Sequence, residues 1–77
     1  MEKNNPAASL THGVTRQAKT RAVAAYMISH NDKHIDELAE LVDGADKDVA
    51  KLLLDAIGSF EMGNTQLRQL LELLDSR

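Results

Sequence analysis

The pattern of apolar and polar positions along the chain predicts helices and favours no strand. Residues 22–28 are seven apolar residues in a row. A buried strand can contain such a run, but three of the seven are alanines and no other segment offers a partner strand. We therefore predict a helix from Thr11 or Thr15 to about His30, with a threonine hydroxyl capping its first turn.

Three further helices follow from the interruptions of the pattern. The Asn-Asp pair at 31–32 can accept hydrogen bonds from the first N–H groups of a helix that begins near Lys33. Gly44 ends that helix, because glycine adopts the left-handed conformation without a steric penalty, and the third helix begins near Asp46. Residues 62–64, Met-Gly-Asn, mark the next break, before a leucine-rich last helix. The sequence thus predicts an all-α protein, a small bundle of four short helices.

The two ends of the chain differ in their content of large apolar side chains. Residues 1–10 contain few of them, so we expect a disordered N-terminal arm at 1–10 and a single helical domain at 11–77. No stretch approaches the roughly 18 apolar residues of a membrane span, and there is no signal-peptide pattern. The absence of cysteine suits a reducing compartment. We expect a cytoplasmic protein with no membrane partner.

The helices carry more apolar side chains than one face of each can hold. At about 100° per residue, Leu73 lies about 60° outside the stripe of the last helix, and Leu54 lies about 60° beyond the stripe of the third. A chain of this size buries only about 60–65% of its extended surface when it folds alone. We therefore predict a homodimer that also binds another protein. The predicted contact surface comprises Val23, Met27, Leu54, Leu70, Leu73 and Leu74.

The charge of the chain is divided between its two halves. The net charge is −3. Residues 1–34 carry five basic and two acidic side chains, whereas residues 35–77 carry four basic and ten acidic ones. The acidic half argues against phosphate backbones or anionic lipid as its partner.

Residues 36–57 partly resemble the helix-turn-helix of bacterial transcription regulators. Ala39 matches the small residue between the two helices, Leu38 and Val42 match apolar positions of the first helix, and Val49 and Leu52 match those of the second. The turn glycine comes one residue late, and three aspartates on the second helix would oppose phosphates. In this alternative, the residues that contact DNA are Arg16, Lys19, Arg21, Lys47 and Lys51.

Candidate chemistry is sparse. His30 and His34 have the spacing at which one helix face can hold a metal, but the predicted break at 31–32 separates them. No serine stands in a nucleophile setting, there is no glycine-rich phosphate loop, and few aromatic residues could line a pocket. We expect no catalytic residue, cofactor, metal or small-molecule substrate. The sequence favours a non-enzymatic regulator or adaptor that acts by association, with a DNA-binding transcription regulator as the alternative.

Overall fold

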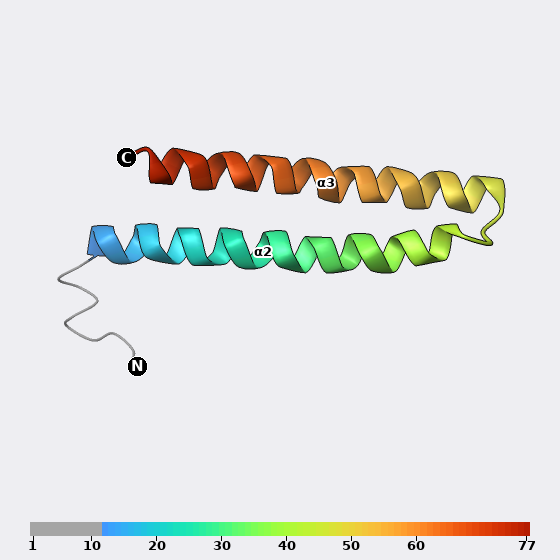
Figure 1. Ribbon diagram of the computed structural model, residues 1–77, viewed down its shortest axis with the longest axis horizontal. Helices are drawn as coiled ribbons and strands as arrows, with labels where there is room; N and C mark the ends of the chain where they lie inside the picture. Colours follow the sequence, from blue (N-terminus) through green and yellow to red (C-terminus); the bar gives the residue numbers. More distant parts are fainter. Residues whose placement is uncertain (1–11) are drawn as a thin grey trace.

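The protein is an antiparallel hairpin of two long helices. The computed structural model describes residues 12–77, and the side chains of residues 16–77. Helix α2 spans His12–Val42 and helix α3 spans Lys47–Asp75. The two helices lie side by side, so that the start of α2 and the C-terminus share one end, the open end, and the connecting turn forms the other (Figure 1). The predicted arm at 1–10 lies outside the described residues.

The prediction of an all-α fold is confirmed, but the prediction of four short helices is wrong. Helix α2 continues through the Asn-Asp pair at 31–32, and α3 continues through residues 62–64. Within residues 12–77 there is therefore one break, at the turn, instead of three.

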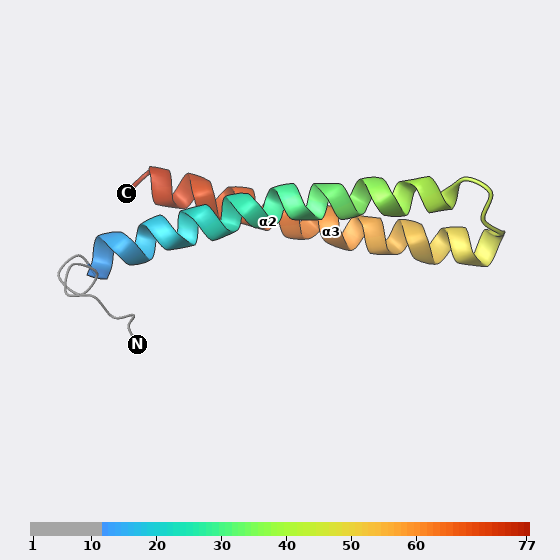
Figure 2. The ribbon, with the colours of Figure 1, turned by 90° about the horizontal axis from the view of Figure 1, so that it is seen from below.

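The helices continue because residues at both predicted breaks contribute to one packed seam. Buried or half-buried positions recur every seven residues, as in a coiled coil. Ala24, Asn31 and Leu38 form such a row on α2. The corresponding row on α3 consists of Leu53, Phe60, Leu67 and Leu74. The helices cross near the middle of their lengths (Figure 2), and Asn31 lies within the seam where the sequence predicted a helix end.

Local helix-breaking tendencies are outweighed by this packing. A glycine inside a helix, such as Gly63, costs about 1 kcal/mol relative to alanine. Helix formation is cooperative, however, and most helical stability in proteins comes from tertiary packing of an apolar face. Seam contacts lie on both sides of Gly63, from Leu53 to Leu74. Ending the helix at residue 63 would disrupt the packing of its second half.

The turn between the helices has the chemistry that the sequence predicted. Gly44 has a φ of +89°, a conformation that residues with a Cβ rarely adopt. The Ala45 N–H donates to the Val42 carbonyl at 3.1 Å. Asp46 is the N-cap of α3, and its carboxylate accepts a hydrogen bond from the Val49 N–H at 3.0 Å. The predicted end at Gly44 and start near Asp46 are confirmed.

A single layer of two helices buries very little apolar surface. Among residues 16–77, Ala24 is the only buried apolar residue, with 3% of its surface exposed. The other apolar seam residues are half-buried, because each helix has one neighbour and solvent on its remaining sides. Within residues 12–77, neither helix combines the length and the hydropathy that a bilayer crossing requires.

Two glycine substitutions should change stability in opposite directions. We expect Gly44→Ala to lower the free energy of unfolding by about 1 kcal/mol, because alanine is strained at this positive φ. We expect Gly58→Ala to raise it by about 0.5–1 kcal/mol, because Gly58 lies inside α3 and an added Cβ there meets nothing within 4 Å. Urea denaturation at one fixed protein concentration measures both, and a loss of stability in Gly58→Ala would contradict a helical conformation at Gly58.

Candidate functional site

A hydrogen-bonded polar cluster lies at the centre of the seam. Asn64 is 2% exposed and Asn31 is 9% exposed. The Asn31 Nδ2 donates to Asn64 Oδ1 at 2.9 Å. The Asn64 Nδ2 in turn donates to Asp32 Oδ1 at 2.9 Å and, at 3.5 Å, to the Ile28 carbonyl. These bonds offset the cost of burying two amides, and they determine which faces of the two helices meet.

The two sides of the seam differ in chemistry. One side is a polar hollow lined by Asp32, Ile35, Asp36, Glu61, Asn64, Thr65 and Arg68. The other side, towards the open end, holds an apolar groove of about 320 Å³. Its lining comprises Lys19, Thr20, Val23, Ala24, Met27, Leu67 and Leu70, so that one charged residue, Lys19, lies at its edge.

The groove belongs to a face of α3 that has no charged residue along the length of the helix. Stepping from Leu70 by three, four or seven residues along α3 keeps to this side of the helix. We call this set the uncharged face: Val49, Leu52, Ala56, Ser59, Gly63, Gln66, Leu70 and Leu73. Four of its members are large apolar residues, and three of these four are exposed.

The structure brings together part of the predicted contact surface. Val23, Met27 and Leu70 line the apolar groove, and Leu73 follows Leu70 by one turn on the uncharged face. Leu74 is instead a half-buried seam residue.

Leu54 lies apart from the other predicted contact residues. It precedes Glu61 and Arg68 by seven and fourteen residues, so it shares the side of α3 that borders the polar hollow.

Sequence reasoning missed three exposed apolar residues on the groove side of the seam. Val49 and Leu52 belong to the uncharged face, and Leu41 follows Met27 by fourteen residues on α2. The seven-residue spacing is the signal that could have identified them, because it shows on which side of the seam each residue lies. An apolar stripe drawn separately for each short helix does not show where the partner helix lies.

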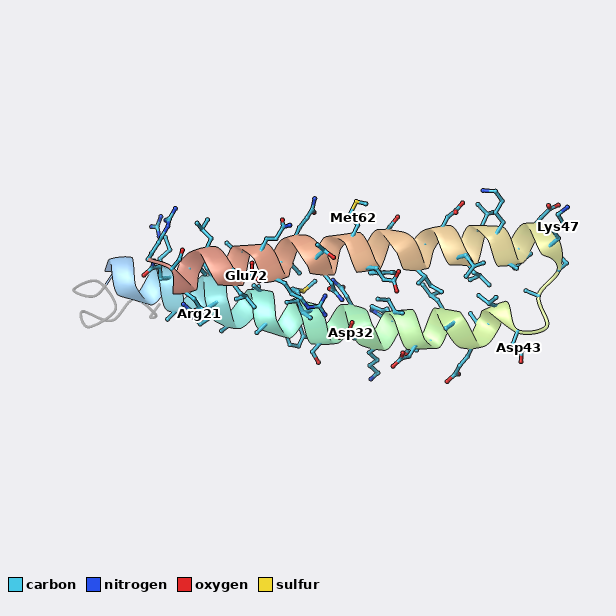
Figure 3. The ribbon with its side chains drawn as sticks, turned by 45° about the horizontal axis from the view of Figure 1, so that its top comes forward. Arg21, Asp32, Asp43, Lys47, Met62 and Glu72 are labelled. Atoms are coloured by element: carbon cyan, nitrogen blue, oxygen red, sulfur yellow. The ribbon has the colours of Figure 1, made fainter. Side chains whose placement is uncertain are left out.

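The structure does not bring together the five cations of the DNA-binding alternative. Arg16, Lys19 and Arg21 lie near the open end, whereas Lys47 and Lys51 lie at the turn, as Arg21 and Lys47 show in Figure 3. About 20 helical residues separate the two groups along α2, which corresponds to about 30 Å. The helices that flank the turn run antiparallel, whereas those of a helix-turn-helix meet at about 90–120°.

Arg21 and Lys51 each lie beside a carboxylate. Arg21 pairs with Asp75, which ties α2 to the end of α3, and Lys51 pairs with Asp55 at 3.1 Å within α3. Both pairs are exposed and contribute little to stability.

The fold turns the divided charge of the sequence into a charge difference along the long axis. Around the turn, residues 36–55 contain seven carboxylates and two lysines. At the open end, residues 16–21 and 68–77 contain five cations and two carboxylates. The hairpin is therefore acidic at its turn and basic at its open end.

His30 and His34 lie on the same side of α2 as the groove. They follow Val23 and Met27 by seven residues each. Because α2 is continuous, the two rings are one turn apart, and their Nε2 atoms are 3.0 Å from each other. The expectation that a helix break separates these histidines is wrong.

Other side chains hold the two rings in place. The His34 Nδ1 lies 3.1 Å from the Glu37 carboxylate. Tyr26 stacks on His30 with 5.5 Å between ring centroids, and Phe60 of α3 lies 5.7 Å from the His34 ring. The four rings link the two helices beside the Asn31–Asn64 pair.

Comparison with known proteins places the hairpin in a family. Residues 20–74 match the model of a domain of unknown function, DUF8180. The chain belongs to the DUF8180 family. The match runs from Thr20 to Leu74, which among residues 16–77 are the first and last half-buried residues of the seam. The DUF8180 domain therefore coincides with the paired part of the hairpin. No curated protein and no solved structure matches the chain.

Removing the Asn64 side chain should destabilise the hairpin. We expect Asn64→Ala to lower the free energy of unfolding by about 1–3 kcal/mol, because it leaves the Asn31 amide buried without its partner. Thr65→Ala is the matched control, since Thr65 is exposed and its hydroxyl donates only to the Glu61 carbonyl of its own helix. Urea denaturation should show a change within about 0.5 kcal/mol for the control. Equal effects of the two substitutions would contradict the role of the amide pair.

Proposed function

We propose that this protein is a non-enzymatic association module, a small regulator or adaptor, whose hairpin packs against a second copy of itself. The contact surface is the apolar groove together with the uncharged face of α3. One observation carries the proposal: large apolar side chains lie exposed along both helices, while Ala24 alone is buried among the apolar residues at 16–77. Burying one leucine contributes about 1.5–3 kcal/mol, so covering this face would be strongly favourable.

The size of the face fits a stable dimer. About 30 helical residues extend over about 45 Å, and two helices side by side are about 20 Å wide. One side of the hairpin thus offers on the order of 800–900 Å², close to the roughly 800 Å² that each partner buries in a typical specific complex. A second hairpin on this side would complete a four-helix bundle, in which each helix has two neighbours.

The charge difference along the hairpin favours an antiparallel arrangement of the two copies. A two-fold axis perpendicular to the long axis would place the acidic turn of one copy beside the basic open end of the other. A parallel arrangement would place like charges together at both ends. Two-fold dimers are the commonest homo-oligomers, and complementary charge determines the orientation of partners.

The DNA-binding alternative has less support, because its five cations are divided between the two ends of the hairpin. For the association module we propose a cytoplasmic location, which the absence of cysteine favours.

Leu73→Lys should weaken self-association, and Leu54→Lys should leave it unchanged. Leu73 is 48% exposed on the uncharged face, and Leu54 is 55% exposed on the side of the polar hollow. We expect the dimer dissociation constant to rise at least about 100-fold for Leu73→Lys, because the substitution removes a buried leucine from each copy. Sedimentation equilibrium measures the constant, and circular dichroism checks that helix content is retained.

Three outcomes would contradict the proposed association. They are a wild-type protein that sediments as an 8.5 kDa monomer at high concentration, equal weakening by the two substitutions, and unfolding of Leu73→Lys.

A further inference from the structure

We propose that His30 and His34 bind a divalent transition-metal ion, such as Cu²⁺, Ni²⁺ or Zn²⁺, through their Nε2 atoms. Both ligands come from one chain, so the site is present in a single hairpin. The imidazole nitrogen is the commonest protein ligand for these ions.

The distance between the two nitrogens fits a shared ion. Metal–nitrogen bonds of about 2.0–2.1 Å with an angle between 90° and 109° place two ligand nitrogens about 2.8–3.4 Å apart. The Nε2 atoms of His30 and His34 are 3.0 Å apart. Two histidines four residues apart on one helix therefore reach a common ion with little adjustment of α2, and its uninterrupted course at 31–32 keeps them in place.

Glu37 occupies the position of the carboxylate that commonly orients a metal-binding histidine. Its Oε1 lies 3.1 Å from His34 Nδ1, so the Nδ1–H donates to the carboxylate. This hydrogen bond places the proton of the neutral ring on Nδ1 and leaves the Nε2 lone pair free for a metal. Such outer carboxylates fix the orientation of the ring that they contact.

The surroundings of the pair leave room for an ion and its remaining ligands. Tyr26 and Phe60 contact the rings from two sides and limit their rotation. Both histidines are only half-buried, so the metal can enter from solvent. Within residues 16–77 no group of three or more histidine, aspartate or glutamate side chains is placed to hold one ion. In a single hairpin, water would therefore complete the coordination.

Without a metal, the two nitrogens can share a proton in a hydrogen bond. When the ion binds, the ring that donates this hydrogen bond must carry its proton on Nδ1 instead, so that both Nε2 lone pairs face the metal. Metal affinity should fall as the pH is lowered, because protons compete with the ion for the imidazole nitrogens.

Isothermal titration of the tag-free full chain with NiCl₂ or ZnCl₂ tests the site. We expect His30→Gln and His34→Gln each to weaken binding at least tenfold, and Glu37→Gln to weaken it about tenfold through loss of the orienting carboxylate. Affinity should be higher for Cu²⁺ than for Ni²⁺ or Zn²⁺. His12→Gln is the control, because His12 is the third histidine of the chain and should have no effect.

Two further measurements separate loss of the site from loss of the fold. Circular dichroism should show the same helix content in all variants. A saturating metal should raise the melting temperature of the wild type and not that of the double variant His30→Gln/His34→Gln, because a ligand that binds the folded state stabilises it.

Retained affinity in the double variant, or its loss in His12→Gln, would overturn the proposed site. Neither histidine substitution adds a charge at neutral pH or removes an apolar side chain from the uncharged face. Sedimentation of these variants without metal therefore still reports on the association module separately.

Discussion

The hydrogen bond between the side chains of Asn31 and Asn64 defines how the two helices face each other. Apolar contacts between helices are not directional, so rotation or sliding of one helix would preserve many of them. The Asn31 and Asn64 amides find each other and Asp32 in only one arrangement. A buried asparagine has the same effect in coiled coils, where it specifies the register at some loss of stability. The apolar groove and the polar hollow lie on opposite sides of the seam, so this arrangement also decides which side chains line each of them.

The same pair helps to explain why large apolar side chains of the hairpin stay exposed. Two central seam positions hold amides, so they contribute none of the stabilisation that a leucine would give there. A layer of two helices already buries little, and the polar centre reduces this further. The exposed leucines of the uncharged face can therefore supply, in a dimer, the apolar burial that the amide pair does not provide. The pair provides orientation within one chain, and the proposed second copy provides the missing burial.

Local signals allowed the turn to be predicted from the sequence, whereas the seam depends on distant residues. Gly44 and Asp46 act within a few residues of their own positions, so their roles are visible in the sequence. The Asn31 side chain could cap a helix in the same way. Its hydrogen-bond partner Asn64, however, lies 33 residues away, and this contact keeps Asn31 in the middle of α2. The spacing of Ala24, Asn31 and Leu38 is the available signal for a continuous seam. Val23, Met27 and Leu70 belong to the contact surface that the sequence predicts, but placing Leu54 on the opposite side required the position of the seam.

The proposed metal site lies near the middle of the hairpin, where the two-fold axis of the proposed dimer would pass. Asn31 lies midway between Thr20 and Val42, the first and last half-buried residues of α2 within 16–42, and His30 and His34 lie beside it. A two-fold axis at this level would bring the histidine pair of the second copy towards the first. Four imidazoles match the tetrahedral coordination of zinc, so the ion would then stabilise the dimer. Sedimentation with and without Zn²⁺ distinguishes the cases. A tighter dimer indicates a shared ion, whereas an unchanged dimer indicates that each chain holds its own.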